Sequence, residues 1–176
     1  MTPISLYEGK KVVRHTSREP TPYLASFDYT LNIRCRILKA HGHKPQAVDI
    51  GCGNGRNAKY LEQLGYEVFS FDRKPDYGVQ IELGKPLPIL KHSIHVVLLQ
   101  YVLMLLDTNT CYKVIQQGFD MCANSAMLVV EVADVKNSLC HGDELVDLMD
   151  VIEEMAMEQG FATNRHEKFK MLAVKA

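Results

Sequence analysis

The chain has 176 residues, which is the usual length of one domain and too short for two full catalytic domains. Apolar residues make up 47% of the sequence and charged residues 23%, a composition that is typical of a folded globular protein and excludes a disordered chain. The formal net charge of -1 gives no whole-molecule attraction to nucleic acid or to anionic lipid.

The cysteines and the apolar stretches indicate the cellular compartment of the protein. The five cysteines form no C-x-x-C pair and are odd in number, so we expect reduced thiols and a cytoplasmic protein without a secretory signal. The longest apolar stretch, residues 96–106, is interrupted by Gln100 and Tyr101. It is shorter than the ~20 residues that a membrane-spanning helix needs, so we expect no membrane partner.

Residues 1–26 are predicted to form an N-terminal arm, and residues 27–176 the folded domain. The arm has no sustained helical or strand period, and it carries the basic residues Lys10, Lys11, Arg14 and Arg18. A helix is predicted over residues 27–41, because apolar residues recur there at helical spacing before Gly42 and Pro45 interrupt the pattern.

The following residues predict a βαβ unit: a strand over 47–50, a glycine-rich turn, a helix over 58–64 and a strand over 67–71. After a shortened corner with a short strand near Ile81, the alternation continues with elements at 95–99, 110–121, 126–132, 143–159, 162–169 and 171–175. This order predicts an α/β fold of the Rossmann-like, doubly wound kind, with a mostly parallel sheet and a C-terminal antiparallel strand pair.

Three glycines, Gly51, Gly53 and Gly55, lie in the turn between the first strand of this unit and its helix. A dinucleotide fingerprint, G-x-G-x-x-G, would need its third glycine at the position of Arg56, so a nicotinamide cofactor is disfavoured. A G-x-G-x-G turn lets the backbone pass close to a ligand without a pyrophosphate. Asp49, just before the turn, can accept a hydrogen bond from an amino group of the ligand. S-adenosylmethionine has such an amino group and has no pyrophosphate.

Asp72 is the second signal, at the end of the next strand. A carboxylate at this place can accept both hydroxyls of a ribose, as an acidic residue does in dinucleotide-binding domains. The alternative for an isolated Asp is a helix N-cap or a solvated turn.

The run from Asp49 to Asp72, which begins D-I-G-C-G-N-G-R-N, resembles the first motif and the acidic second-strand end of class I S-adenosylmethionine-dependent methyltransferases. Within that superfamily it is most similar to the tellurite-resistance methyltransferases, as are the later V-L-M-L-L run at 102–106 and M-L-A at 171–173. The resemblance implies methyltransferase activity with S-adenosylmethionine as cofactor, bound by the motif residues Asp49, Gly51, Cys52, Gly53, Asn54, Gly55 and Asn57. Cys52 is expected to serve as a small packing residue rather than a nucleophile.

Further candidate residues follow the later strands. Glu82 is predicted near the adenine amino group, with a solvent-facing loop carboxylate as the alternative. Gln100 and Tyr101 follow the fourth strand, where open α/β sheets bind their ligands. The ring of Tyr101 can face the sulfonium or the substrate, or instead pack under the next helix. Asp134 follows the fifth strand and could orient a substrate, and His141 lies in the next loop; the alternative for both is a structural or merely exposed residue.

No histidine pattern has metal-ligand spacing, so no metal is predicted, and no residue stands out as a catalytic base. We therefore predict a methyltransferase for a small-molecule acceptor, by resemblance an oxyanion of tellurium or selenium, a thiol or another soft nucleophile. One alternative is a methyltransferase for RNA or protein that holds its substrate with the basic arm. The other is a module that binds S-adenosylmethionine without catalysis.

Overall fold

A computed structural model describes residues 4–7, 10–13, 17–132, 144–167 and 170–175. Seven strands form one sheet in the order β5-β4-β3-β6-β7-β9-β8. Its strands are β3 (Gln46–Ile50), β4 (Glu67–Asp72), β5 (Val79–Gln80), β6 (Ile94–Gln100), β7 (Cys122–Glu131), β8 (Phe161–Glu167) and β9 (Lys170–Lys175). β9 pairs antiparallel with both of its neighbours, and the other pairings are parallel. The predicted mostly parallel sheet with an antiparallel C-terminal pair is confirmed.

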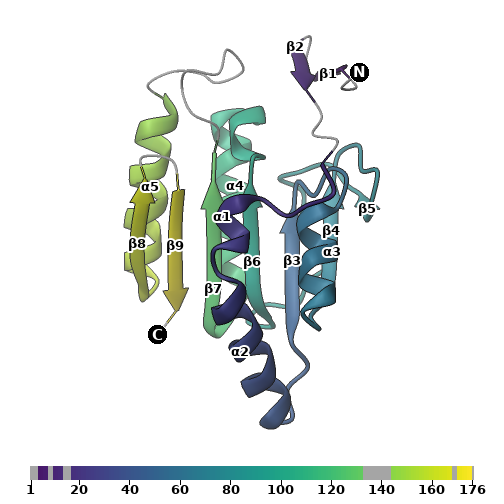
Figure 1. Cartoon of the computed structure of the whole chain (residues 1–176). Helices are drawn as coiled ribbons and strands as arrows, with labels where there is room; N and C mark the ends of the chain where they lie inside the picture. Colours follow the sequence, from purple (N-terminus) through teal and green to yellow (C-terminus); the bar gives the residue numbers. More distant parts are fainter. Residues whose placement is uncertain (1–3, 8–9, 14–16, 133–143, 168–169, 176) are drawn as a thin grey trace.

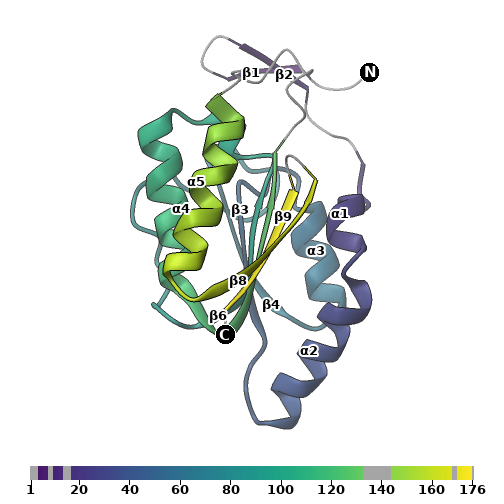
Figure 2. The same ribbon diagram turned by 90° about the vertical axis from the view of Figure 1, so that its left-hand side faces the viewer.

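Helices cover both faces of the sheet (Figures 1 and 2). One face carries α4 (Thr108–Met121) and α5 (Glu144–Glu158), and the other carries α1 (Pro22–Ala25), α2 (Asp28–Ala40) and α3 (Arg56–Gln63). Residues of β6 alternate between these layers: Val97 and Leu99 pack with the α4 side, whereas Val96 and Leu98 pack with the α2 side. This period of two explains why the strand reads as a continuous apolar run, since both of its faces are buried.

Local sequence sets the ends of the helices. In α2, Leu31 and Cys35 are buried one turn apart, and the helix stops before Gly42, whose φ is +77°. In α3, Gly55 occupies the N-cap position with a φ of +73°, and the Asn54 side chain accepts a hydrogen bond of 3.2 Å from the Arg56 N–H.

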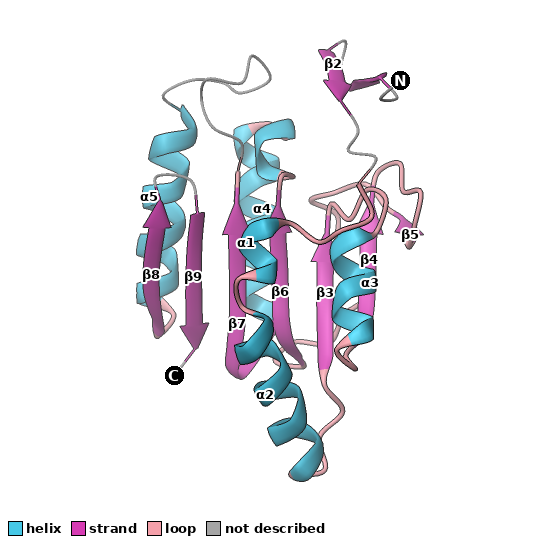
Figure 3. Ribbon diagram, in the orientation of Figure 1, coloured by secondary structure: helices cyan, strands magenta, loops and turns pink. Residues whose placement is uncertain are grey.

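The corner between β4 and β6 is short, as predicted. Residues 73–93 are all described, and they contain the two-residue strand β5 and no helix. Figure 3 shows the rest of this corner as loop. The chain then passes from β6 through the 3-10 turn η1 (Leu103–Leu105) into α4.

The N-terminal region differs from the predicted arm in its local structure. β1 (Ile4–Tyr7) and β2 (Lys10–Val13) pair antiparallel in a separate two-stranded sheet, and α1 begins at Pro22. The strands are only four residues long, too short for a period to stand out in the sequence. α1 is stabilised by contacts with distant residues: Tyr23 and Leu24 are buried in the core cluster that includes Leu61 and Leu98.

Candidate functional site

The sheet reverses its direction of winding between β3 and β6, so their carboxyl ends flank a crevice at the topological switch point (Figure 1). The glycine turn follows β3, and Gln100, Tyr101 and Val102 follow β6. The fold thus brings together two segments that lie 45 residues apart in the sequence, from Gly55 to Gln100.

The glycine turn is built from left-handed backbone. Gly51, Gly53 and Gly55 have φ values of +80°, +52° and +73°. A Cβ on Gly51 would overlap the side chain of Val102, whereas a Cβ on Gly53 would meet no atom within 4 Å. Gly51 therefore serves the packing of β3 against the segment after β6, and Gly53 leaves backbone open to a ligand.

Asp72 lies at the end of β4 and is joined to this turn. Its Oδ2 accepts a hydrogen bond of 3.0 Å from the Gly53 N–H, and its Oδ1 accepts one of 2.8 Å from the Lys74 N–H. Each carboxylate oxygen has a second lone pair, so the group can still accept ribose hydroxyls. The structure brings Asp72 to the predicted place, and its role toward a ribose remains a prediction.

Asp49 is 2% exposed, and its Oδ2 has no hydrogen-bond partner. Burial, and then the neighbouring charge of Asp72, raise the pKa of Asp49 to about 7, against the effect of a backbone hydrogen bond from Ala58. A buried carboxyl oxygen without a donor, beside an open glycine backbone, fits a ligand that carries an ammonium group.

Cys52 is buried, and its thiol donates to the backbone oxygen of Tyr77 at 3.0 Å. Burial, followed by the charges of Asp49 and Asp72, raises the pKa of this thiol, which keeps it protonated. These contacts fit the packing role expected for Cys52. The loop that contains Tyr77 also bonds to the turn through the Asp76 N–H, which donates to the Gly53 oxygen at 3.0 Å.

A buried polar network connects the site to the N-terminal segment. Asn57 Nδ2 donates to Gln100 Oε1 at 3.0 Å, and Asn57 Oδ1 accepts the Thr21 N–H at 2.9 Å. Gln100 Nε2 lies 2.8 Å from both Thr21 Oγ1 and Glu131 Oε2. Asn54 adds a second link, because its Nδ2 donates to the Ser17 oxygen at 3.0 Å. Residues 17–21 therefore lie against the carboxyl ends of the central strands.

Tyr101 sits directly after β6 with a φ of +58°. Its N–H donates to the backbone oxygen of Glu131 at 2.7 Å, and its hydroxyl donates to Glu131 Oε1 at 2.8 Å. Burial and the hydrogen bond to Glu131 raise the pKa of the Tyr101 phenol. Tyr101 is thus bonded to Glu131 at the carboxyl ends of the central strands, and its role toward a ligand remains a prediction.

Glu131 and Thr21 were not among the predicted site residues. Glu131 ends an apolar strand, and a charge at the carboxyl end of such a strand is the signal that would have found it. Thr21 precedes Pro22, and a Thr-Pro pair is typical of an N-cap followed by the first helical residue.

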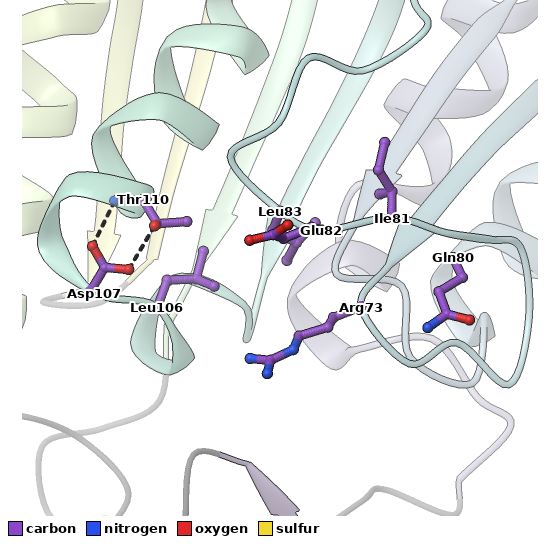
Figure 4. Close-up of a pocket in the computed structure, with 8 residues that line it drawn as sticks. All are labelled: Arg73, Gln80, Ile81, Glu82, Leu83, Leu106, Asp107 and Thr110. Atoms are coloured by element: carbon purple, nitrogen blue, oxygen red, sulfur yellow. Dashed lines mark hydrogen bonds between the residues drawn. The ribbon is translucent and has the colours of Figure 1, made fainter.

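Glu82 lies in the wall of a cavity of about 510 Å³. This cavity is lined by Arg73, Gln80, Ile81, Glu82, Leu83, Leu106, Asp107 and Thr110. Figure 4 shows the Arg73 side chain extending below Glu82 and Leu83 toward Leu106. Asp107 caps α4 by accepting the Thr110 N–H at 3.0 Å. Arg73, the residue after Asp72, is part of the cavity wall, and the role of Glu82 near an adenine remains a prediction.

Other expectations fall partly outside the described residues. Asp134, His141 and Arg14 lie outside them, Lys10 and Lys11 are described only as part of β2, and Arg18 is exposed. Within the described ranges, no group of three metal-ligating side chains is present. In the same part of the chain, every helix is too short or too polar to cross a membrane.

Residues 31–86, from α2 to the loop after β5, match the family model of the tellurite resistance protein TehB. A comparison with curated proteins gives no match. Among solved structures, a TehB-like S-adenosylmethionine-dependent methyltransferase from Corynebacterium glutamicum has a TM-score of 0.56 at 16% identity, over 85% of this chain and 97% of its own.

Two further structures agree. A methyltransferase from Archaeoglobus fulgidus has a TM-score of 0.56 at 16% identity, over 77% of this chain and 70% of its own. Magnesium protoporphyrin IX methyltransferase from Synechocystis, with bound S-adenosylmethionine, has a TM-score of 0.52 at 17% identity, over 86% and 81% of the two chains. The chain has the fold of class I methyltransferases, and the predicted resemblance to that class and to the tellurite-resistance family is confirmed.

Proposed function

We propose that this chain, which has the class I methyltransferase fold, is an S-adenosylmethionine-dependent methyltransferase that acts on a small-molecule acceptor. One observation carries the proposal: the turn that follows Asp49 leaves the backbone of Gly53 open, Asp72 is bonded to Gly53 at 3.0 Å, and the buried Asp49 has an unpaired Oδ2. These groups suit a ligand with a ribose at one end and an ammonium at the other.

The residues have separate parts in holding this ligand. Asp72 accepts the ribose hydroxyls, and Asp49 accepts from the ammonium group through its unpaired oxygen. Gly53 lets the ligand lie against the backbone, since a side chain there would occupy its place. The cavity beside Glu82 receives the adenine, and Tyr101 faces the sulfonium from the end of β6.

In this reaction the main task of the protein is to position the methyl acceptor. When bound, S-adenosylmethionine supplies a methyl group that is already activated, which moves to the acceptor while the electrons of the broken bond stay on sulfur. The chain holds the acceptor about 3 Å from that methyl carbon and in line with the breaking bond. The segment around Thr21, which is buried and bonded to Gln100, keeps water from the carboxyl end of β6.

A small acceptor is favoured by the same segment. Ser17 and Thr21 bond to residues after β3 and to the end of β6, so the N-terminal segment already covers part of the crevice. The match to the model of a tellurite resistance protein adds an oxyanion of tellurium to the candidates. By the resemblance of the sequence we include oxyanions of selenium, thiols and other soft nucleophiles. The four described cysteines are free and buried, which suits the reducing conditions of the cytoplasm.

The test is titration calorimetry of the purified chain with S-adenosylmethionine and with S-adenosylhomocysteine, followed by an acceptor screen with a labelled methyl donor. We expect micromolar binding, about -8 kcal/mol, and label transfer to a thiol or to tellurite or selenite. If neither ligand gives heat at millimolar concentration, the proposal is wrong. Binding without transfer to any small acceptor, RNA or protein would identify a non-catalytic module. Salt-sensitive labelling of RNA alone would instead identify the basic N-terminal residues as a substrate-binding arm.

A further inference from the structure

Glu131, the last residue of β7, is a carboxylate with 2% of its surface exposed. Its two oxygens are both engaged at the neighbouring strand end: Oε1 accepts the Tyr101 hydroxyl and Oε2 accepts Gln100 Nε2, each at 2.8 Å. Its backbone oxygen accepts the Tyr101 N–H at 2.7 Å. Tyr101 is therefore tied to one residue through both its backbone and its side chain.

The backbone of Tyr101 needs such support. A φ of +58° is unusual for a large residue with a Cβ, and it persists only where the surroundings hold it. This conformation turns the chain sharply out of β6 and places Val102 against Gly51 of the glycine turn. Tyr101 thus stands between the glycine turn and β7.

Two carboxylates act electrostatically on Tyr101. The Glu131 carboxylate accepts a hydrogen bond from the phenol, which pushes electron density toward the ring, and the charges of Glu131 and Glu167 both act on Tyr101. Arg56, at the start of α3, acts on it with the opposite sign. An electron-rich ring attracts a cation over its face more strongly than it attracts a neutral group.

Building on the proposed function, we infer that Glu131 is a positioning residue that holds Tyr101 toward the sulfonium of S-adenosylmethionine. The pair makes the site prefer the charged methyl donor over the neutral product S-adenosylhomocysteine. This preference favours release of the product after transfer. Glu131 itself touches neither ligand and acts through Tyr101.

A purely structural role for Glu131 would have a different signature. If it only secured the ends of β6 and β7, its loss would weaken the binding of both ligands by the same factor. The ratio of the two dissociation constants separates these roles, and it requires no knowledge of the methyl acceptor.

The experiment measures the Kd of S-adenosylhomocysteine divided by that of S-adenosylmethionine, by calorimetry, for four proteins besides the unmodified chain. Glu131→Gln removes the charge and keeps the shape. Tyr101→Phe keeps the ring and removes its side-chain hydrogen bond to Glu131, and it serves if the buried Glu131→Gln variant fails to fold. We expect each to lower the ratio about three- to tenfold. The double variant should match either single variant, because both changes break one interaction.

The fourth variant, Glu167→Gln, is the matched control. Glu167 is an exposed carboxylate within electrostatic reach of Tyr101, and it pairs with Lys170 Nζ at 2.8 Å. Its ratio should stay within about twofold of the unmodified protein. The inference is overturned if Glu131→Gln and Tyr101→Phe leave the ratio unchanged, if their effects add in the double variant, or if Glu167→Gln lowers the ratio as much. An unmodified chain that binds neither ligand would instead overturn the proposed function.

Discussion

The backbone N–H of Gly53 donates a hydrogen bond of 3.0 Å to Oδ2 of Asp72, and this bond joins the glycine turn after β3 to the end of β4. Asp72 also accepts the N–H of Lys74 through its other oxygen, at 2.8 Å. The carboxylate proposed to bind a ribose therefore also holds the loop that would receive it.

Replacement of Asp72 by Ala should lower the affinity for S-adenosylmethionine about 10- to 100-fold, since hydrogen bonds to a charged group are lost. The sequence alone predicts little change in the stability of the ligand-free protein, because a strand-end carboxylate is expected to be partly solvated. Because two backbone N–H groups lose their acceptor, we now also expect a loss of about 1 kcal/mol or more in the free energy of unfolding. The affinity of Asp72→Asn should fall between those of the unmodified protein and of Asp72→Ala.

Calorimetry and urea denaturation on the same proteins check both effects. Asp76→Ala, an exposed carboxylate in the same loop, is the control, and it should bind the ligand as the unmodified protein does. Unchanged affinity in Asp72→Ala would remove this residue from the ligand site and leave it a purely local role in the turn.

Gly53→Ala should weaken ligand binding while the fold tolerates the substitution. The new Cβ meets no atom within 4 Å, so the expected loss of stability is the cost of a left-handed residue, about 1 to 2 kcal/mol. Gly42→Ala is a matched control, because Gly42 has a φ of +77° and equally open surroundings after α2, at the opposite end of β3 from the glycine turn. Thermal melts should give similar losses for the two variants, and calorimetry should show weaker binding only for Gly53→Ala. Equal affinity in both would mean that the ligand does not lie on this turn.

Asp49 should make the stability of the ligand-free protein depend on pH. Its pKa is raised from an ordinary value near 3.8 to about 7, so the folded state binds a proton that the unfolded state releases between pH 4 and pH 7. Stability contributed by this group is therefore complete below pH 4 and falls as the pH rises through that window, by at most about 1.4 kcal/mol per pH unit. Asp49→Asn cannot ionise and should lose this slope. Denaturant unfolding at several pH values between 4 and 8 measures it, and parallel curves for the two proteins would contradict the raised pKa.

Thr21→Val tests the network that anchors the N-terminal segment. The hydroxyl accepts the Leu24 N–H at 3.2 Å as an N-cap and accepts Gln100 Nε2 at 2.8 Å, both in a buried setting. Its loss should lower the free energy of unfolding by about 1 to 2 kcal/mol. Ser26→Ala, which removes an exposed hydroxyl that donates to the Tyr23 oxygen, should cost less, about 0.5 kcal/mol. If urea denaturation gives equal losses of unfolding free energy for Thr21→Val and Ser26→Ala, the contact with Gln100 adds nothing to the stability.

Much of the scaffold follows from the sequence alone. The strand, glycine turn, helix and strand of residues 46–72 were predicted because each depends on neighbours in the chain: apolar alternation sets the strands, and glycines permit the left-handed turn. The position of Asp72 beside that turn follows as well, because a right-handed βαβ crossover brings the two strand ends to one edge of the sheet.

The tertiary structure alone decided which polar groups meet there. Thr21 and Gln100 are 79 residues apart in sequence, and Gln100 and Glu131 are 31 apart, yet their side chains share hydrogen bonds. No local period encodes such pairs, because they depend on how α1, β6 and β7 pack against each other. The same packing leaves Asp49 buried with one unpaired oxygen and holds Tyr101 in a left-handed conformation, since burial and backbone support come from residues distant in the chain.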